Sequence, residues 1–172
     1  TLPDTLRMEH VQLDLQGDLQ SGYALQGQAN LAAEQQHMSL LLDALLTAQG
    51  LQLKEVRLGD RQQGYLQVQG EVDWQSSLAV QGQLDWQDLP WQRLWPQLDA
   101  LDWRLRRLQG PFSYQDGRYQ GELHAEADGP AGPFTLHSPF AGDLQRVQLA
   151  DVRLQAGRGQ ASGRLELNLG AQ

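Results

Sequence analysis

Two near-copies of one nine-residue phrase constrain the fold of this chain more than any other feature. The copies occupy residues 66–74 and 78–86 and read approximately apolar-Gln-apolar-Gln-Gly-polar-apolar-Asp-Trp. Strict alternation of apolar and polar residues is typical of a strand with one apolar and one solvated face. Folded about Ser76, the copies form an antiparallel hairpin with the cross-strand pairs Val68–Leu84, Val72–Val80 and Gly70–Gly82. Two glycines facing each other in mid-strand weaken a sheet, so this pair calls for a structural reason.

Composition excludes several classes of protein. The 172 residues carry a net charge of −8, only 40% of them are apolar, and none is cysteine. The acidic balance disfavours binding to nucleic acid or to an anionic membrane surface. Disulfides and thiolate metal sites are unavailable. No run approaches the roughly 18 apolar residues that a membrane-spanning helix needs.

The first half of the chain is predicted to continue the strand pattern. Residues 6–31 read as two strands, with a register that pairs Leu19 with Leu25 and Gly17 with Gly27. Residues 37–48 are ambiguous, because Leu and Ala favour a helix whereas the alternation favours a strand; we predict a strand. Another strand covers 51–58, with a bulge at Lys54-Glu55.

The strand rhythm stops at residues 89–96, where we predict one short helix. Asp88 is a capping residue, Pro90 suits a first helical turn, and Pro96 ends it. Trp91 and Trp95 would then share one apolar helical face.

The second half resumes the strands. An Asp116-Gly117 turn predicts a hairpin in which Phe112 faces Gly121. A loop is expected at 128–133, strands at 134–137 and 147–156, and a turn at Arg158-Gly159 that pairs Leu154 with Gly163. About ten strands in succession predict an all-β antiparallel meander. We expect a single segment, 1–172, with a first half of about 1–87, an insert of about 88–97 and a second half of about 98–172.

Glycines recur near mid-strand on the predicted apolar face. A row of residues without side chains lets a sheet crease sharply, which would turn it into a trough with an apolar interior. The predicted crease glycines are Gly17, Gly27, Gly70, Gly82, Gly121 and Gly163. The predicted groove lining is Leu13, Leu15, Leu25, Leu66, Val68, Val72, Trp74, Leu78, Val80, Leu84, Trp86, Trp103, Leu105, Phe112, Leu123, Phe134, Leu136, Val147, Leu149, Leu165 and Leu167.

Trp74 and Trp86 are the last residues of two neighbouring antiparallel strands, so they are expected at opposite edges of the sheet. Amphipathic tryptophans suit these two rims of a trough. The alternative is a β-sandwich or collapsed barrel whose core is filled by protein alone.

No catalytic motif is present, so we do not expect an enzyme or a cofactor. His124 and His137 fall on adjacent predicted strands and the same polar face. Without a third ligand at fixed spacing, we predict no metal site there.

The repeated phrase, and the ending from Leu154 to Leu167, resemble the long periplasmic repeats of the TamB family in the AsmA-like group. The resemblance covers most of the chain and lies in its rhythm rather than in a catalytic signature. It implies a β-taco fold, a periplasmic segment of an inner-membrane-anchored protein, and an outer-membrane TamA-like partner. The chain opens on Thr1 without a signal peptide and stops directly after a strand pattern, so we expect a piece of a longer protein.

Three hypotheses on function follow. The first is a segment of a lipid conduit, whose apolar groove carries phospholipid acyl chains between the inner and outer membranes in outer-membrane biogenesis. The second is a chaperone-like groove or edge that receives strands of outer-membrane proteins or autotransporters during assembly. The third and least favoured is a fragment of a transmembrane barrel, because the tryptophans cluster in the middle third of the chain rather than in two girdles.

Overall fold

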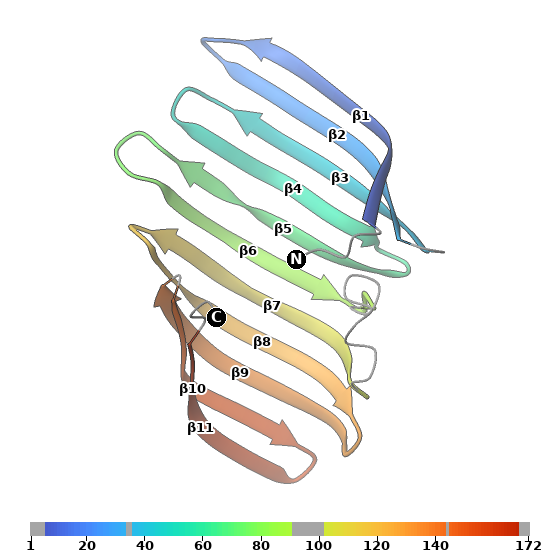
Figure 1. The fold of residues 1–172 in the computed structure, drawn as a ribbon, viewed down its shortest axis with the longest axis vertical. Helices are drawn as coiled ribbons and strands as arrows, with labels where there is room; N and C mark the ends of the chain where they lie inside the picture. The colour runs from blue at the N-terminus through green and yellow to red at the C-terminus, as the bar shows by residue number, and fades with distance from the viewer. Residues whose placement is uncertain (1–5, 34–35, 91–101, 144, 169–172) are drawn as a thin grey trace.

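The protein folds as one antiparallel sheet of eleven strands that follow one another in chain order (Figure 1). The computed structural model describes residues 6–33, 36–90, 102–143 and 145–168. The strands are β1 (Leu6–Asp18), β2 (Gly22–Ala33), β3 (Gln36–Leu46), β4 (Gly50–Asp60), β5 (Gly64–Asp73), β6 (Ala79–Gln87), β7 (Arg104–Gln115), β8 (Arg118–Gly129), β9 (Gly132–Asp143), β10 (Arg146–Ala156) and β11 (Gly159–Asn168). Within these ranges no helix occurs, and thus none with the length and hydropathy to cross a membrane.

The sheet is open. Among the described strands, β1 and β11 stand at opposite ends of the strand order and each pairs with one neighbour only (Figure 1). The chain exposes 12262 Å², whereas a compact protein of its mass exposes about 8400 Å². A β-sandwich or collapsed barrel filled by protein alone is therefore wrong for this chain.

The central hairpin has the predicted register. Val68 faces Leu84, Val72 faces Val80, and the two glycines of the repeat face each other across β5 and β6. Three further predictions are confirmed: residues 36–46 form a strand, Lys54 is the extra residue of a bulge between β3 and β4, and Phe112 faces Gly121.

The register of the first hairpin differs from the prediction. Leu25 faces Leu15 rather than Leu19, and Gly17 faces Tyr23 rather than Gly27. The turn lies earlier, at residues 19–21. Asp18 holds it there, because its Oδ1 accepts hydrogen bonds from the backbone N–H groups of Gln20 and Ser21 at 2.8 Å each. Short carboxylate-to-backbone bonds of this kind fix a tight turn.

The last hairpin also differs. Its turn residues are Gly157 and Arg158, and Gly157 supplies the positive φ of +55° that the turn requires. Ala156 therefore faces Gly159, and Leu154 faces Ala161 instead of Gly163.

Two predicted connections need revision. The loop expected at 128–133 is a two-residue turn, since Gly129 at the end of β8 faces Gly132 at the start of β9. This makes β9 a strand of 12 residues that extends well beyond the four predicted. The helix expected at 89–96 falls mostly outside the described residues, and Leu89 and Pro90 themselves are not helical.

A small apolar cluster is the only core found among the described residues. Leu31, Met38, Trp86 and Leu89 are its buried members. It runs along one end of the strands, where Leu66 faces Trp86 in the register of β5 and β6. Leu89, which follows β6, is fully buried, and its Cδ1 would lie 3.2 Å from a Cβ added to Gly59 in β4.

Candidate functional site

One face of the sheet is apolar from the first strand to the last. Residues that face each other across an antiparallel pair project to the same side of the sheet, so the register can be followed from strand to strand. One such row, which we call the central row, crosses all eleven strands without a polar residue: Leu15, Leu25, Ala44, Leu53, Gly70, Gly82, Phe112, Gly121, Phe140, Leu149 and Leu165. We call this side the apolar face.

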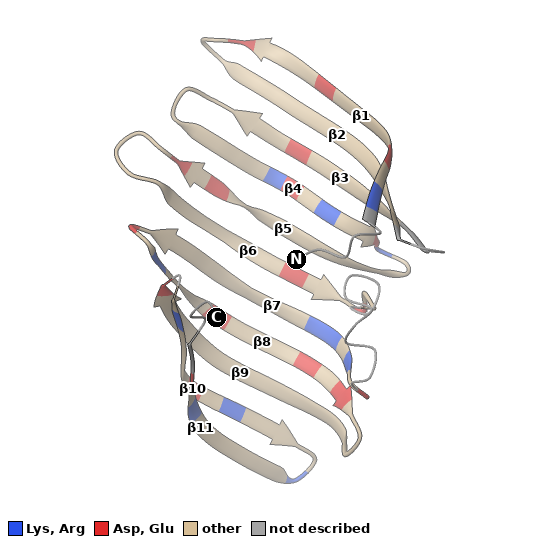
Figure 2. Cartoon of the chain, in the orientation of Figure 1, with Lys and Arg blue, Asp and Glu red and all other residues tan. Residues whose placement is uncertain are grey.

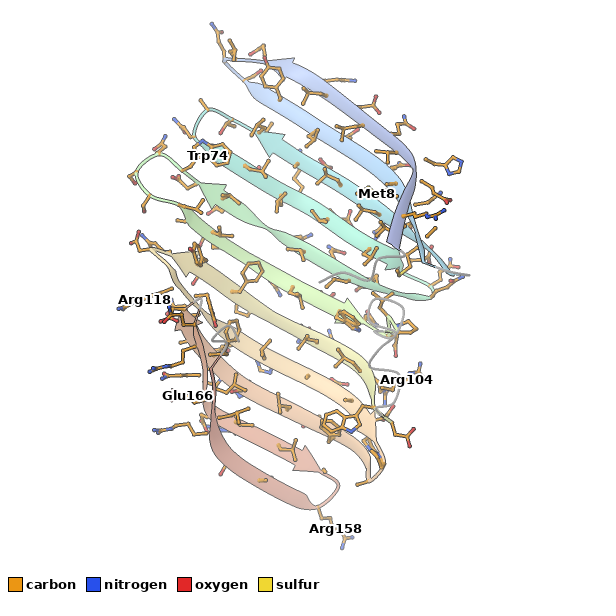
Figure 3. The ribbon with its side chains drawn as sticks, viewed as in Figure 1. Met8, Trp74, Arg104, Arg118, Arg158 and Glu166 are labelled. Carbon is orange, nitrogen blue, oxygen red and sulfur yellow. The ribbon has the colours of Figure 1, made fainter. Side chains whose placement is uncertain are left out.

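The register places most of the predicted groove residues on the apolar face. The exceptions are Trp74, Leu78 and Trp103, which lie in connections outside the strands. Trp74 remains at the margin of the sheet, 43% exposed, with its indole N–H donating to the Ala48 carbonyl (Figure 3). Trp86 is only 5% exposed and belongs to the buried cluster, so its predicted place at a boundary with water is wrong.

The apolar face is covered unevenly. Side chains on the central strands are half-buried by their neighbours on the same face, for example Val68 and Leu84. The edge strand β1 is bare: Met8 (Figure 3), Val11, Leu13 and Leu15 are 57–63% exposed. Leu19, in the turn that follows β1, is 87% exposed. Contiguous exposed apolar surface of this kind marks a binding surface.

Three of the six predicted crease glycines share the central row. In that row, Phe112 covers Gly82 and Phe140 covers Gly121: a Cβ added to either glycine would lie within 2.8 Å of the neighbouring ring. An aromatic ring over a cross-strand glycine fills the gap that the missing side chain leaves. Gly82 and Gly121 thus leave space on the apolar face that the rings of Phe112 and Phe140 occupy.

The other three glycines do not continue this row. Gly27 lies on the same face as the central row but two residues further along β2, where it faces Leu13 and Leu42. Gly17 stands beside the first turn with a φ of +145°. Gly163 faces Val152, and no described atom lies near the position of an added Cβ. The predicted six-glycine crease line is therefore wrong in extent.

Sequence reasoning missed two positions that shape the sheet. In β7, Gly110 and Pro111 interrupt the pairing with β8, and in β9, Ser138 and Pro139 interrupt the pairing with β10. A proline cannot donate to the ladder, which frees the strands to bend there. The signal was available, since Gly-Pro and Ser-Pro inside a strand pattern mark such breaks.

The opposite side, which we call the polar face, carries several hollows that the sequence did not predict, and two of them have volumes of about 1000 Å³. The first, about 1000 Å³, follows the central row and is lined by glutamines such as Gln69 and Gln81. The second, about 1060 Å³, lies over β7 to β11. Charged residues are scattered over the strands rather than gathered in one block (Figure 2).

Shifted pKa values occur at Tyr65, Asp18 and Asp151. Burial raises the pKa of the Tyr65 phenol, and its hydrogen bond to Asp85 Oδ2, 2.9 Å long, adds to the shift. Bonds from the Ser21 backbone and hydroxyl lower the pKa of Asp18. The hydrogen bond from Arg153 lowers the pKa of Asp151. All of these effects act within the sheet and its turns, and none activates a nucleophile.

A cluster of metal-ligating side chains occurs on the polar face. His124 and His137 face each other across β8 and β9, as the sequence predicted, with ring centroids 4.2 Å apart. Glu122, two residues before His124, brings its Oε2 to 3.8 Å from His124 Nε2 and 3.9 Å from His137 Nε2. The sequence analysis did not group Glu122 with the two histidines, although residues two apart on a regular strand share a face.

Comparison of the chain with models of protein families, with characterised proteins and with solved structures finds no match.

Proposed function

We propose that this chain is a segment of a periplasmic lipid conduit, and that its apolar face carries the acyl chains of phospholipids. The observation that carries the proposal is the continuous apolar row across an open sheet. A chain that exposes about half as much surface again as a compact protein of its mass leaves this face without a protein cover. Such a face needs an apolar occupant, because uncovered apolar surface is costly in water.

An acyl chain suits this surface. Each methylene removed from water gains about 0.8 kcal/mol, so a lipid tail lying along the row gains binding energy without any polar contact. The face offers no fixed charge for a head group, so selectivity among phospholipids should be weak. An occupant held by non-directional contacts can slide along the face, which is what a conduit requires.

The geometry proposed is a β-taco, a sheet folded lengthwise into a trough with the apolar face inside. Support comes from the interruptions of strand pairing at Pro111, between β7 and β8, and at Pro139, between β9 and β10, which leave the sheet free to bend there. The buried cluster around Trp86 would then close one side of the trough.

The wider setting rests on the resemblance to the TamB family. We propose a periplasmic location within an inner-membrane-anchored protein and cooperation with an outer-membrane TamA-like partner. In that setting, repeated segments of this kind would join their apolar faces into one path between the two membranes.

The proposal is tested by the lipid that copurifies with the chain from a diderm bacterial host. Wild-type protein, Val68→Asp and the matched control Gln69→Asp are extracted with organic solvent, and phospholipid is counted per chain by mass spectrometry. We expect lipid with the wild type and with Gln69→Asp, whose new charge lies on the polar face. Loss of lipid from Val68→Asp alone supports the proposal, and equal lipid on all three contradicts it.

A second function is favoured by one observation, the bare edge of β1. Its unpaired backbone and exposed leucines would suit the addition of a strand from an outer-membrane protein. In that case Leu15→Lys, which protects the edge, would abolish crosslinking to an alternating strand peptide, and Val68→Asp would leave it intact. Crosslinking that depends on Val68 and not on Leu15 would refute this alternative.

A further inference from the structure

The polar face holds three side chains with the geometry of a divalent metal site. The ligating atoms of Glu122, His124 and His137 all lie within 4.8 Å of one another. Their side chains are between 35% and 56% exposed, so an ion reaches them from solvent. This site is separate from the apolar face and does not depend on lipid binding.

The sheet itself brings these three residues together. His124 and His137 are directly opposite each other across the ladder of β8 and β9, and Glu122 follows on the same face of β8. Positions on paired strands are fixed by backbone hydrogen bonds, so only side-chain rotations separate the present arrangement from a coordinated one. Zinc at about 2.0–2.1 Å from each ligand brings ligand atoms to about 3.4 Å from one another, so the longest separation must close by roughly 1.5 Å.

The chemistry of the donors selects the kind of ion. Two imidazole nitrogens and one carboxylate suit zinc and similar first-row divalent ions, whereas magnesium and calcium prefer oxygen donors alone. The set also lacks a fourth protein ligand, which is the composition of an open site whose last position is taken by water or by a bound molecule.

The surroundings leave room at this open position. Glu122 lines the hollow along the central row, and both histidines line the hollow over β7 to β11, so the cluster lies where the two meet. Arg153 faces His137 across β9 and β10, and its Nη2 donates a hydrogen bond of 2.6 Å to Asp151 Oδ2. That pairing offsets the positive charge that would otherwise oppose a bound cation.

We propose that Glu122, His124 and His137 bind one divalent transition-metal ion, of which Zn²⁺ is the best match. The ion would tie β8 to β9 next to the break in pairing at Pro139 and present an open coordination position to the polar hollows.

Isothermal titration of the purified chain with ZnCl₂ tests the proposal. We expect one saturable site in the wild type. Substitution of groups that only orient metal ligands costs about 10–100-fold in affinity, so His124→Ala, His137→Ala and Glu122→Gln should each cost at least as much. His10→Ala, a histidine on the distant edge strand β1, is the matched control and should bind as the wild type does.

A second readout separates coordination from adventitious binding. Hydrogen exchange of β8 and β9 should slow when Zn²⁺ is added to the wild type, because a ligand that binds only the folded state stabilises it. The same measurement checks that each variant folds, and Glu122→Gln serves if a histidine variant does not. Absence of a saturable site, or affinity unchanged in all three ligand variants, overturns the proposal.

Discussion

Gly110 is the position where the structure makes its sharpest prediction about stability. A Cβ placed there would overlap the carbonyl oxygen of Glu122 and lie 2.8 Å from its carbonyl carbon. Carbon atoms in contact prefer about 3.5–4.0 Å, so β8 would have to move away from β7 by about 1 Å. The obstacle is backbone, which cannot rotate aside as a side chain can. We expect Gly110→Ala to cost about 1–3 kcal/mol, the usual cost of overpacking.

Gly163 in β11 provides the matched control. No described heavy atom lies within 4 Å of a Cβ added there, and its φ is not in the left-handed region. Gly163→Ala should therefore be neutral, or stabilising by about 0.4–1 kcal/mol through the loss of unfolded-state entropy.

Hydrogen exchange read strand by strand is the appropriate assay. Among the described strands, each contacts mainly its neighbours in sequence, so stability is close to a sum of nearest-neighbour terms and unfolding need not be all-or-none. Gly110→Ala should lower the opening free energy of β7 and β8 and leave β1 to β3 unchanged. Equal protection of β7 and β8 in Gly110→Ala and wild type would refute the close approach on which the reasoning depends.

Three further predictions concern single groups. Because the pKa of Asp18 is lowered, its carboxylate should stabilise the first turn at pH values above the unfolded-state pKa of 3.8, and this stabilisation should be lost as the pH falls through the folded-state pKa. In carboxyl NMR titrations, Ser21→Ala should raise the Asp18 pKa, because the hydroxyl hydrogen bond is removed. Tyr65 should ionise above 10.0 in a phenolate absorbance titration, and Asp85→Asn should lower its pKa only in part, because burial is the larger cause. Gly117→Ala should cost about 1–2 kcal/mol through its φ of +79° alone, since no described atom crowds that site, and hydrogen exchange should show a lower opening free energy for β7 and β8.

The sequence was most informative where alternation and turn residues agreed. The register of β5 and β6 followed directly from the repeated phrase, and Asp116-Gly117 set the hairpin of β7 and β8. A shift of register by an even number of residues keeps every side chain on its own face. The apolar face was therefore predictable even at the first hairpin, where Leu25 faces Leu15 instead of Leu19.

Features that depend on contacts between strands were less predictable. The first hairpin was misplaced because Asp18 ends β1 through local hydrogen bonds that periodicity does not report. The close approach of Gly110 to β8 and the polar hollows involve several strands at once, which the pattern of one strand does not report. The place of Glu122 beside the histidines could have been predicted from the sequence, because Glu122 stands two residues before His124 on the same strand face.

The most direct test of the lipid conduit is a scan of photo-crosslinking residues along β5, at positions 66, 67, 68 and 69, in cells. The positions alternate between the two faces, with Leu66 and Val68 on the apolar face and Gln67 and Gln69 on the polar one. The account predicts phospholipid adducts at 66 and 68 and none at 67 and 69. Adducts of equal yield at all four positions, or adducts confined to 67 and 69 beside the polar hollow, would contradict it.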